Sequence, residues 1–249
     1  MKFINKYKSY SFNKRNREKI KYIIIHYTAL PSIEHAINHL CNEKNKVSSH
    51  YLISQKGDIF RLVSDKERAW HAGQSYWKTN TDLNSISLGI ELDYSLKFKN
   101  NRFNKSMINS LCKLIKILVA RYKIPKENIL GHSDIAPYRK KDPGPYFPWK
   151  YLVSKNITYN PKKVDNEILI KFRSFLIKKN SPFKKKMAIF MLNYIGYNIS
   201  MASNQYMYKK LLKAYQMRFL QTSINGRLCD KTYNHIMYNY VNLLLTHKR

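Results

Sequence analysis

The chain has 249 residues and is 44% hydrophobic, so it can bury a substantial core, and global disorder is excluded. Its 46 basic and 15 acidic side chains give a formal net charge of +31, which suits an anionic partner such as nucleic acid, acidic lipid or bacterial cell wall. The excess is spread evenly, since residues 161–249 carry 17 basic and 3 acidic side chains, a net charge of +14. This distribution favours general adhesion to an anionic surface over one basic groove.

The three cysteines are odd in number and widely spaced, which argues against a disulfide framework and against a cysteine-based metal site. Residues 1–20 form a basic, polar N-terminal segment. A secretory signal needs an apolar run of roughly 7–15 residues after its basic region, and the first apolar run, at 23–25, is too short. The sequence therefore predicts neither an ordinary secretory signal nor a transmembrane segment. The cytoplasm, another export route and a leader already removed all fit this expectation.

Strands and helices alternate over the first part of the chain. The apolar run at 22–27 predicts a buried strand, and Ser32 can cap a helix that runs to about residue 43. The clearest helix spans 104–122, where apolar residues recur with a 3.6-residue period. Three further short strands are predicted, the first two joined by a hairpin turn: 50–54, 59–63 and 86–92. This alternation predicts an α/β domain.

Two later parts of the chain depart from this pattern. Residues 131–149 hold four prolines and two glycines, which predicts a long, stiff, irregular loop of the kind that often carries function. Residues 155–163 have the composition of a linker. Beyond the linker, helices are predicted at about 165–180, 184–195, 206–221 and 230–246. The α/β domain is therefore followed by a small all-helical domain.

Two histidines and one aspartate are candidate metal ligands. His26 closes the first apolar strand, His132 begins the proline-rich loop, and Asp142 follows ten residues later. Two histidines and a carboxylate, with one position left for water, form a standard catalytic zinc set. Each residue also has an ordinary explanation: a histidine can be satisfied by a backbone partner, and Asp142 suits the turn before Pro143. Spacing alone leaves both explanations open, because His26 lies more than 100 residues upstream.

Glu91 and Lys140 are candidate catalytic residues near these ligands in sequence or in the predicted sheet. Glu91 lies inside an apolar strand, where a charge is costly unless it is paired or functional. Facing a metal cleft, it would have the raised pKa of a useful general base. Lys140 lies two residues before Asp142, where an ammonium could stabilise an oxyanion. A solvent-facing position on the strand and a solvated surface lysine are the alternatives.

Five segments in this order resemble one known family: IIIHYT (23–28), VSSHYLI (47–53), AWHAG (69–73), SLGIEL (87–92) and GHSDIAPYRKKDPGPYFPW (131–149). They resemble the zinc-dependent N-acetylmuramoyl-L-alanine amidases, a fold shared with phage lysozyme-type amidases and peptidoglycan recognition proteins. The resemblance covers residues 20–150, and its last motif is long and specific. It implies a mixed central sheet flanked by helices and a zinc amidase catalytic domain over 21–155.

The resemblance also implies roles for individual residues. His26, His132 and Asp142 match the family's Zn2+ ligands, Glu91 its catalytic carboxylate and Lys140 its oxyanion-stabilising lysine. The family cleaves the amide between the lactyl group of N-acetylmuramic acid and L-alanine, so peptidoglycan or muropeptides are the expected substrate and no nucleic acid is expected. Two residues of the AWHAG motif are candidates for substrate contact. They are His71 and Trp70. A purely structural role is an equally open alternative for His71, and a position in the core is one for Trp70.

The C-terminal region, 164–249, resembles less closely the helical peptidoglycan-binding domain that follows this amidase in some bacterial members. The resemblance rests on LNYIGYNI (192–199), AYQMRF (214–219) and NGRLCDKT (225–232). A helical cap that only stabilises the catalytic domain is the alternative. The wall-binding interpretation places the protein in the cell envelope or periplasm, whereas the missing signal favours the cytoplasm.

Two other functions compete with the amidase interpretation. The charge of +31 also suits a nucleic-acid-binding protein, although the even charge distribution and the zinc motif argue against one. A non-catalytic peptidoglycan-binding protein on the same fold is the second alternative. Because all three ligand positions hold competent residues, the sequence favours an active enzyme.

Overall fold

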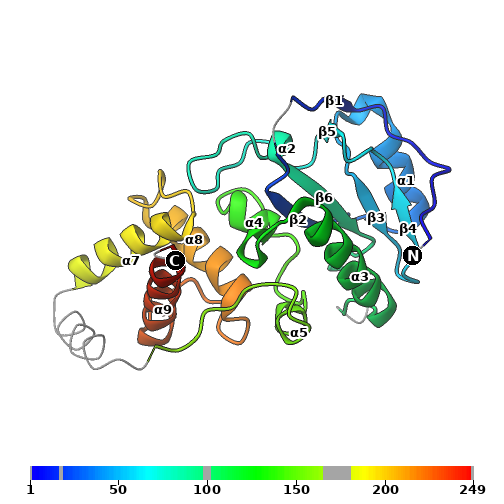
Figure 1. Ribbon diagram of the computed structural model, residues 1–249. Helices are drawn as coiled ribbons and strands as arrows, with labels where there is room; N and C mark the ends of the chain where they lie inside the picture. Colours follow the sequence, from blue (N-terminus) through cyan, green and yellow to red (C-terminus); the bar gives the residue numbers. More distant parts are fainter. Residues whose placement is uncertain (1, 17–18, 98–101, 165–180, 248–249) are drawn as a thin grey trace.

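The computed structural model describes the chain except for residues 1, 17–18, 98–101, 165–180 and 248–249 (Figure 1). The strands are β1 (Phe12–Lys14), β2 (Tyr22–Tyr27), β3 (Tyr51–Ile53), β4 (Ile59–Arg61), β5 (Glu67–Ala69), β6 (Ser87–Leu92) and β7 (Ile129–Gly131). The longer helices are α1 (Ile33–Cys41), α3 (Lys105–Tyr122), α7 (Ser181–Ile195), α8 (Gln205–Phe219) and α9 (Asp230–His247). The short helices are η1 (Glu43–Asn45), α2 (Leu83–Ile86), η2 (Lys126–Asn128), α4 (His132–Ile135) and α5 (Trp149–Ser154).

Five strands form a mixed sheet in the order β4-β3-β6-β2-β7. β3, β6, β2 and β7 are parallel, and β4 pairs antiparallel with β3. Parallel strands end at the same edge of a sheet, which is where α/β proteins bind ligands. The register places His26 beside Glu91 and Ile25 beside Gly131, so the ends of three strands meet there.

The two faces of the sheet are covered differently. Ile23 and Ile25 of β2 and the leucines and isoleucine of β6 pack with α3 in one buried cluster. Since side chains alternate along a strand, the other face carries Ile24 and His26 from β2 and Gly89 and Glu91 from β6. The isoleucine and the two leucines of β6 thus fill the α3 side, while its small and polar residues leave space on the opposite side.

The C-terminal helices α7, α8 and α9 lie at the opposite end of the molecule from β4, next to α4 and α5 (Figure 1). One hydrophobic cluster joins them to the sheet, because Ile24 and Leu130 belong to the same cluster as Leu192, Leu211 and Tyr215. The prediction of a mixed central sheet flanked by helices, with further helices at the C-terminal end of the chain, is confirmed. None of the helices of the described residues has the length and apolar character that a membrane span requires.

The structure also differs from expectation in several short elements. The 131–149 segment is not wholly irregular, since α4 begins at His132 and α5 at Trp149. The strands β1, β5 and β7 were not predicted, because each has three residues and is defined by its pairing more than by its sequence pattern. The predicted helix at 165–180 falls outside the described residues.

The N-terminal segment is part of the folded structure. β1 pairs antiparallel with β5, and the amide of Ile4 donates to the carbonyl of Ile59. The guanidinium of Arg15 donates to the carbonyls of Ser85, Glu67 (2.8 Å) and Ser87 (3.0 Å). Burial is the main cause that lowers the pKa of Arg15. These contacts fix the start of β6 behind the site described next.

Candidate metal centre and active site

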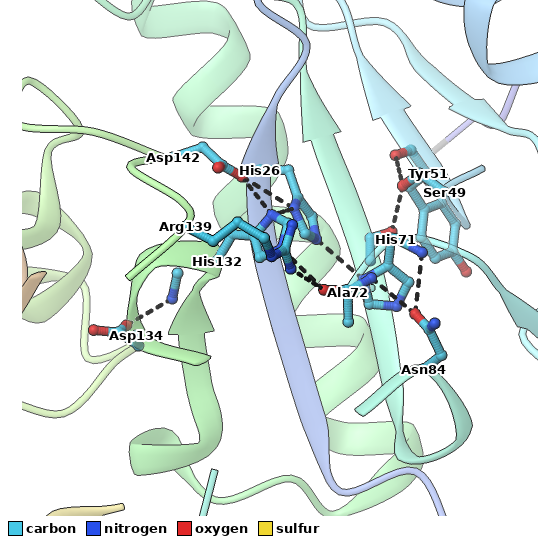
Figure 2. Close-up of polar contacts among 12 residues, drawn as sticks. His26, Ser49, Tyr51, His71, Ala72, Asn84, His132, Asp134, Arg139 and Asp142 are labelled. Carbon is cyan, nitrogen blue, oxygen red and sulfur yellow. Dashed lines mark hydrogen bonds and ion pairs between the residues drawn. The ribbon is translucent and has the colours of Figure 1, made fainter. Parts of the chain in front are cut away.

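His26, His132 and Asp142 converge on one point at the carboxyl edge of the sheet (Figure 2). His26 lies in β2, His132 begins α4 directly after β7, and Asp142 lies in the turn region that follows α4. All three residues are buried, with exposed fractions of 1%, 3% and 9%. The amide of Ser133 donates to the carbonyl of Asp142 at 2.8 Å, which ties the last two ligands together.

The spacing of the three side chains fits a single metal ion. Nδ1 of His26 lies 2.9 Å from Nδ1 of His132, and Oδ2 of Asp142 lies 3.1 and 3.0 Å from these two nitrogens. Ligand atoms at about 2.0–2.1 Å around a tetrahedral zinc ion are separated by roughly 3.3 Å, only slightly more than the spacing seen here. The three atoms that face one another are two nitrogens and one carboxylate oxygen. One cation can bind all three at once, whereas a single shared proton can bridge only two of them.

Hydrogen bonds behind the ligands fix their tautomers. With Nδ1 facing the cluster, His132 donates through Nε2–H to the carbonyl of Ala72 at 3.1 Å. His26 donates through Nε2–H to Nδ1 of His71 at 3.0 Å. His71 then donates through its own Nε2–H to Oγ of Ser87 at 3.2 Å, and Ser87 donates to the carbonyl of Leu83. This relay leaves both Nδ1 atoms unprotonated and free to bind a metal.

The charges of the ligands suit a cation. Burial, and after it the nearby His132, lowers the pKa of His26 to about 4, so its imidazole is neutral at physiological pH. Burial alone would raise the pKa of Asp142, but His132 and His26 outweigh it and hold that pKa well below its usual range. A neutral imidazole at His26 and an ionised carboxylate at Asp142 are the forms in which these two side chains bind zinc.

Glu91 lies next to this centre, on the same face of the sheet as His26. The residue is partly exposed, yet its Oε2 is fully buried and has no hydrogen-bond partner. Burial, and after it the charge of Asp142, raises the pKa of Glu91 to about 8, while Lys140 opposes the shift. A buried carboxylate oxygen without a partner is costly, which is typical of a catalytic group kept ready for a substrate proton.

Lys140 is half-buried and contributes a positive charge to the centre. Its charge lowers the pKa of both His26 and Glu91, so its ammonium lies within electrostatic reach of them. The neighbouring Arg139 has a different task, because its Nη2 donates to the carbonyls of Ala72 (3.0 Å) and Gln74 (2.7 Å). These bonds hold Arg139 against the segment that carries Ala72 and Gln74.

The two residues of the AWHAG motif take separate positions. His71 is 5% exposed and lies behind His26, so its position favours the structural role over substrate contact. The indole of Trp70 donates to Asn13 in β1 at 2.6 Å, on the side of the N-terminal segment, and its contact with substrate stays a prediction. The other two tryptophans, Trp77 and Trp149, are buried.

Sequence reasoning missed several residues that shape the centre. Gly89 provides space for His71, since a Cβ at position 89 would lie 2.4 Å from Cγ of His71. Ser87 orients the same imidazole, and Ala72 supplies the carbonyl for His132. The alternation of Ser87, Gly89 and Glu91 on one face of β6 was the available signal, but the partners could not be known before the sheet was assembled.

The fold and the site define an α/β protein with a mixed sheet and a buried group of side chains that could hold a metal ion. The model of the N-acetylmuramoyl-L-alanine amidase family matches residues 16–145, and the chain belongs to this family. AmiD, the N-acetylmuramoyl-L-alanine amidase of Escherichia coli, is 34% identical over 227 residues, which cover 86% of this chain and 80% of AmiD. The chain is therefore an amidase, as the sequence predicted.

Solved structures extend the match to the C-terminal helices. AmiD in complex with the substrate anhydro-N-acetylmuramic acid-L-Ala-D-γ-Glu-L-Lys matches with a TM-score of 0.77 at 31% identity, covering 91% of both chains. AmpDh3 from Pseudomonas aeruginosa matches with a TM-score of 0.78 at 28% identity, covering 97% of this chain and 99% of AmpDh3. The 1,6-anhydro-N-acetylmuramyl-L-alanine amidase AmpD of Haemophilus influenzae is 35% identical over 162 residues, 57% of this chain and 86% of AmpD.

Proposed function

We propose that this amidase holds Zn2+ with His26, His132 and Asp142, and that Glu91 and Lys140 carry the reaction. The observation that supports this most is the position of Glu91, whose unpartnered Oε2 is buried on the same face of the sheet as His26. When bound, the zinc ion would polarise the scissile carbonyl and make an attacking water more acidic.

The protein side chains then have separate tasks. Glu91 accepts the proton of the attacking water and passes it to the nitrogen of the leaving amine, because its raised pKa suits both steps. The ammonium of Lys140 stabilises the negative oxygen that develops on the carbonyl. His71 positions His26, because Nδ1 of His71 accepts the hydrogen bond that Nε2–H of His26 donates. The amide between N-acetylmuramic acid and L-alanine is the bond that breaks.

We propose anhydro-muropeptides as the preferred substrate. The AmiD structure holds an anhydro-N-acetylmuramic acid peptide, and a structure of AmpDh3 in complex with anhydromuramic pentapeptide matches this chain with a TM-score of 0.77 at 28% identity. Mass spectrometry of a muropeptide digest tests both the bond and the substrate. We expect intact stem peptides that begin with L-alanine, released faster from anhydro-muropeptides than from reduced ones. Cleavage at another bond would contradict the proposal.

We propose the cell envelope as the site of action, the location that the wall-binding interpretation of the C-terminal region favours. The support is the net charge of +14 on residues 161–249, which suits an anionic wall. Binding of the full chain to purified sacculi at rising salt concentration tests this proposal. Loss of the bound fraction with salt would support electrostatic adhesion, whereas no binding at low salt would remove the support for an envelope location.

A further inference from the structure

The C-terminal helices contact the segment that carries two of the three metal ligands. α8 packs against α4, whose first residue is His132. On the far side of the ligands, the side-chain amide of Gln221 donates to the carbonyls of Pro145 (2.8 Å) and Phe147 (2.7 Å). In between, the hydroxyl of Tyr138 donates to the carbonyl of Asn198 at 2.8 Å. The ligand segment is thus held along its length by the helical region.

The most buried of these contacts runs through Asp134, two residues after His132. Its Oδ2 accepts the amide of Gly131 at 2.7 Å, which fixes the turn from β7 into α4 (Figure 2). Its Oδ1 accepts the hydroxyl of Tyr197 at 2.7 Å, and Tyr197 lies between α7 and α8. Asp134 and Tyr197 are 1% and 0% exposed. One carboxylate therefore links the backbone beside a metal ligand to the helical region.

Arg218 of α8 supports the same turn from the other side. Its Nη2 donates to the carbonyl of Ile129 in β7 and to Oγ1 of Thr158, both at 2.7 Å. Its guanidinium carbon lies 3.5 Å from the centre of the Trp149 ring, a cation–π contact. Trp149 in turn lies against Gly131, since a Cβ at position 131 would be 3.3 Å from its Cζ2. Arg218 is 5% exposed, so substrate cannot reach it.

We propose that Tyr197 and Arg218 are positioning residues for the amidase reaction. Acting through Asp134 and Trp149, they hold the backbone from β7 to α4 at the angle that aims His132 at the metal. A small cavity of about 20 Å³ at this junction is lined by Asp134, Tyr197 and Arg218, so the network lies between the two regions and apart from the ligand cluster. The helical region then completes the active site. This inference rests on the proposed zinc site.

Tyr197→Phe in the full chain tests the proposal, with Tyr215→Phe as its matched control. Tyr215 is also fully buried, and its hydroxyl lies 2.9 Å from Nδ1 of His235, within the helical region. Both variants lose one buried hydroxyl and keep the ring. Zinc affinity is measured by competition with a chelator, and ligand geometry by the visible absorption of the cobalt-substituted protein. Loss of a group that is hydrogen-bonded to a metal ligand typically costs 10–100-fold in affinity, and Tyr197 acts one residue further out, through Asp134.

We expect Tyr197→Phe to weaken zinc binding about tenfold, the lower end of that range, to shift the cobalt bands and to lower kcat more than it changes KM. Tyr215→Phe should change zinc affinity less than about threefold, although both variants lower the melting temperature of the zinc-free protein. Equal zinc affinities and equal cobalt spectra in the two variants would overturn the proposal.

A second variant covers the case in which Tyr197→Phe does not fold. Asp134→Asn keeps the shape of the acceptor and leaves Tyr197 in place, and we expect the same loss of zinc affinity. Unchanged affinity in this variant would also overturn the proposal. Zinc binding by the wild-type protein distinguishes failure of the proposed zinc site from failure of the positioning role. A wild type that binds no zinc contradicts the proposed function. Tight zinc binding in the wild type and in both variants contradicts only the positioning role.

Discussion

His26 and Glu91 lie side by side in register on two parallel strands, and both side chains face away from α3. This pairing brings a metal ligand and a buried carboxylate to the same edge of the sheet without any contact between distant loops. In the proposed mechanism His26 of β2 binds the metal and Glu91 of β6 transfers the proton, so these two roles come from neighbouring strands. The two functions can therefore be removed one at a time.

Glu91→Gln should abolish hydrolysis while zinc stays bound. The amide keeps the size of the side chain but cannot accept the proton of water, and general-base catalysis contributes about 10²–10⁴-fold. We expect kcat to fall by at least about 100-fold, with the zinc content unchanged by elemental analysis. Glu34→Gln, on the exposed side of α1, is the control and should keep full activity. Near-normal turnover by Glu91→Gln would mean that another group takes the proton.

Glu91 also predicts how the stability of the zinc-free protein depends on pH. Burial raises its pKa from 4.5 to about 8, so between these values the folded state holds a proton that the unfolded state has lost. The free energy of unfolding must therefore fall as pH rises through this window. Urea unfolding at pH 5 and pH 8 should show Glu91→Gln gaining roughly 1–3 kcal/mol over wild type at pH 8 and little at pH 5. A gain of equal size at both pH values would contradict the burial of an ionisable Oε2.

His132→Ala should remove tight zinc binding and the stabilisation that comes with it. A ligand that is a thousandfold above its dissociation constant stabilises the folded state by about 4 kcal/mol. In a chain of this length, that corresponds to a rise in melting temperature of roughly 8–16 °C on zinc addition. We expect calorimetry to show this rise for wild type and for His35→Ala, whose histidine is exposed on α1. The same rise in His132→Ala would place the ion elsewhere.

The sequence predicted those elements whose signal is local. The helix at 105–122 follows from its apolar period, and β2 and β6 follow from short, mainly apolar segments. β1 and β7 could not be predicted, because their three residues are strands only through their partners. The charge of Glu91 within a mainly apolar segment pointed to this residue, but not to the side chains that surround it.

The three proposed metal ligands could be named from the sequence only as part of a set of motifs. His26 and His132 are 106 residues apart, and nothing local in the sequence shows that their Nδ1 atoms meet. The family resemblance supplied that pairing. It did not supply the contacts of Tyr197 and Arg218 with the ligand segment, because these depend on how the C-terminal helices pack against β7 and α4. Long-range packing was the information that the sequence patterns lacked.

Gly89→Ala should disturb the proposed metal site through His71, the residue that accepts a hydrogen bond from His26. A methyl group at this position would lie 2.4 Å from Cγ of His71, and the imidazole cannot retreat without losing its bonds to His26 and Ser87. We expect a loss of about 1–3 kcal/mol in the free energy of unfolding, together with weaker zinc binding.

The double variant Gly89→Ala/His71→Ala identifies the cause of this loss. Removing the imidazole makes room for the new methyl group, so the two changes should cost less in stability together than the sum of their separate costs. Zinc affinity should stay low in the double variant, because His26 has lost the acceptor that orients it. Strictly additive stability losses, measured by urea unfolding of the four proteins in the cycle, would show that Gly89 is needed for some reason other than space for His71.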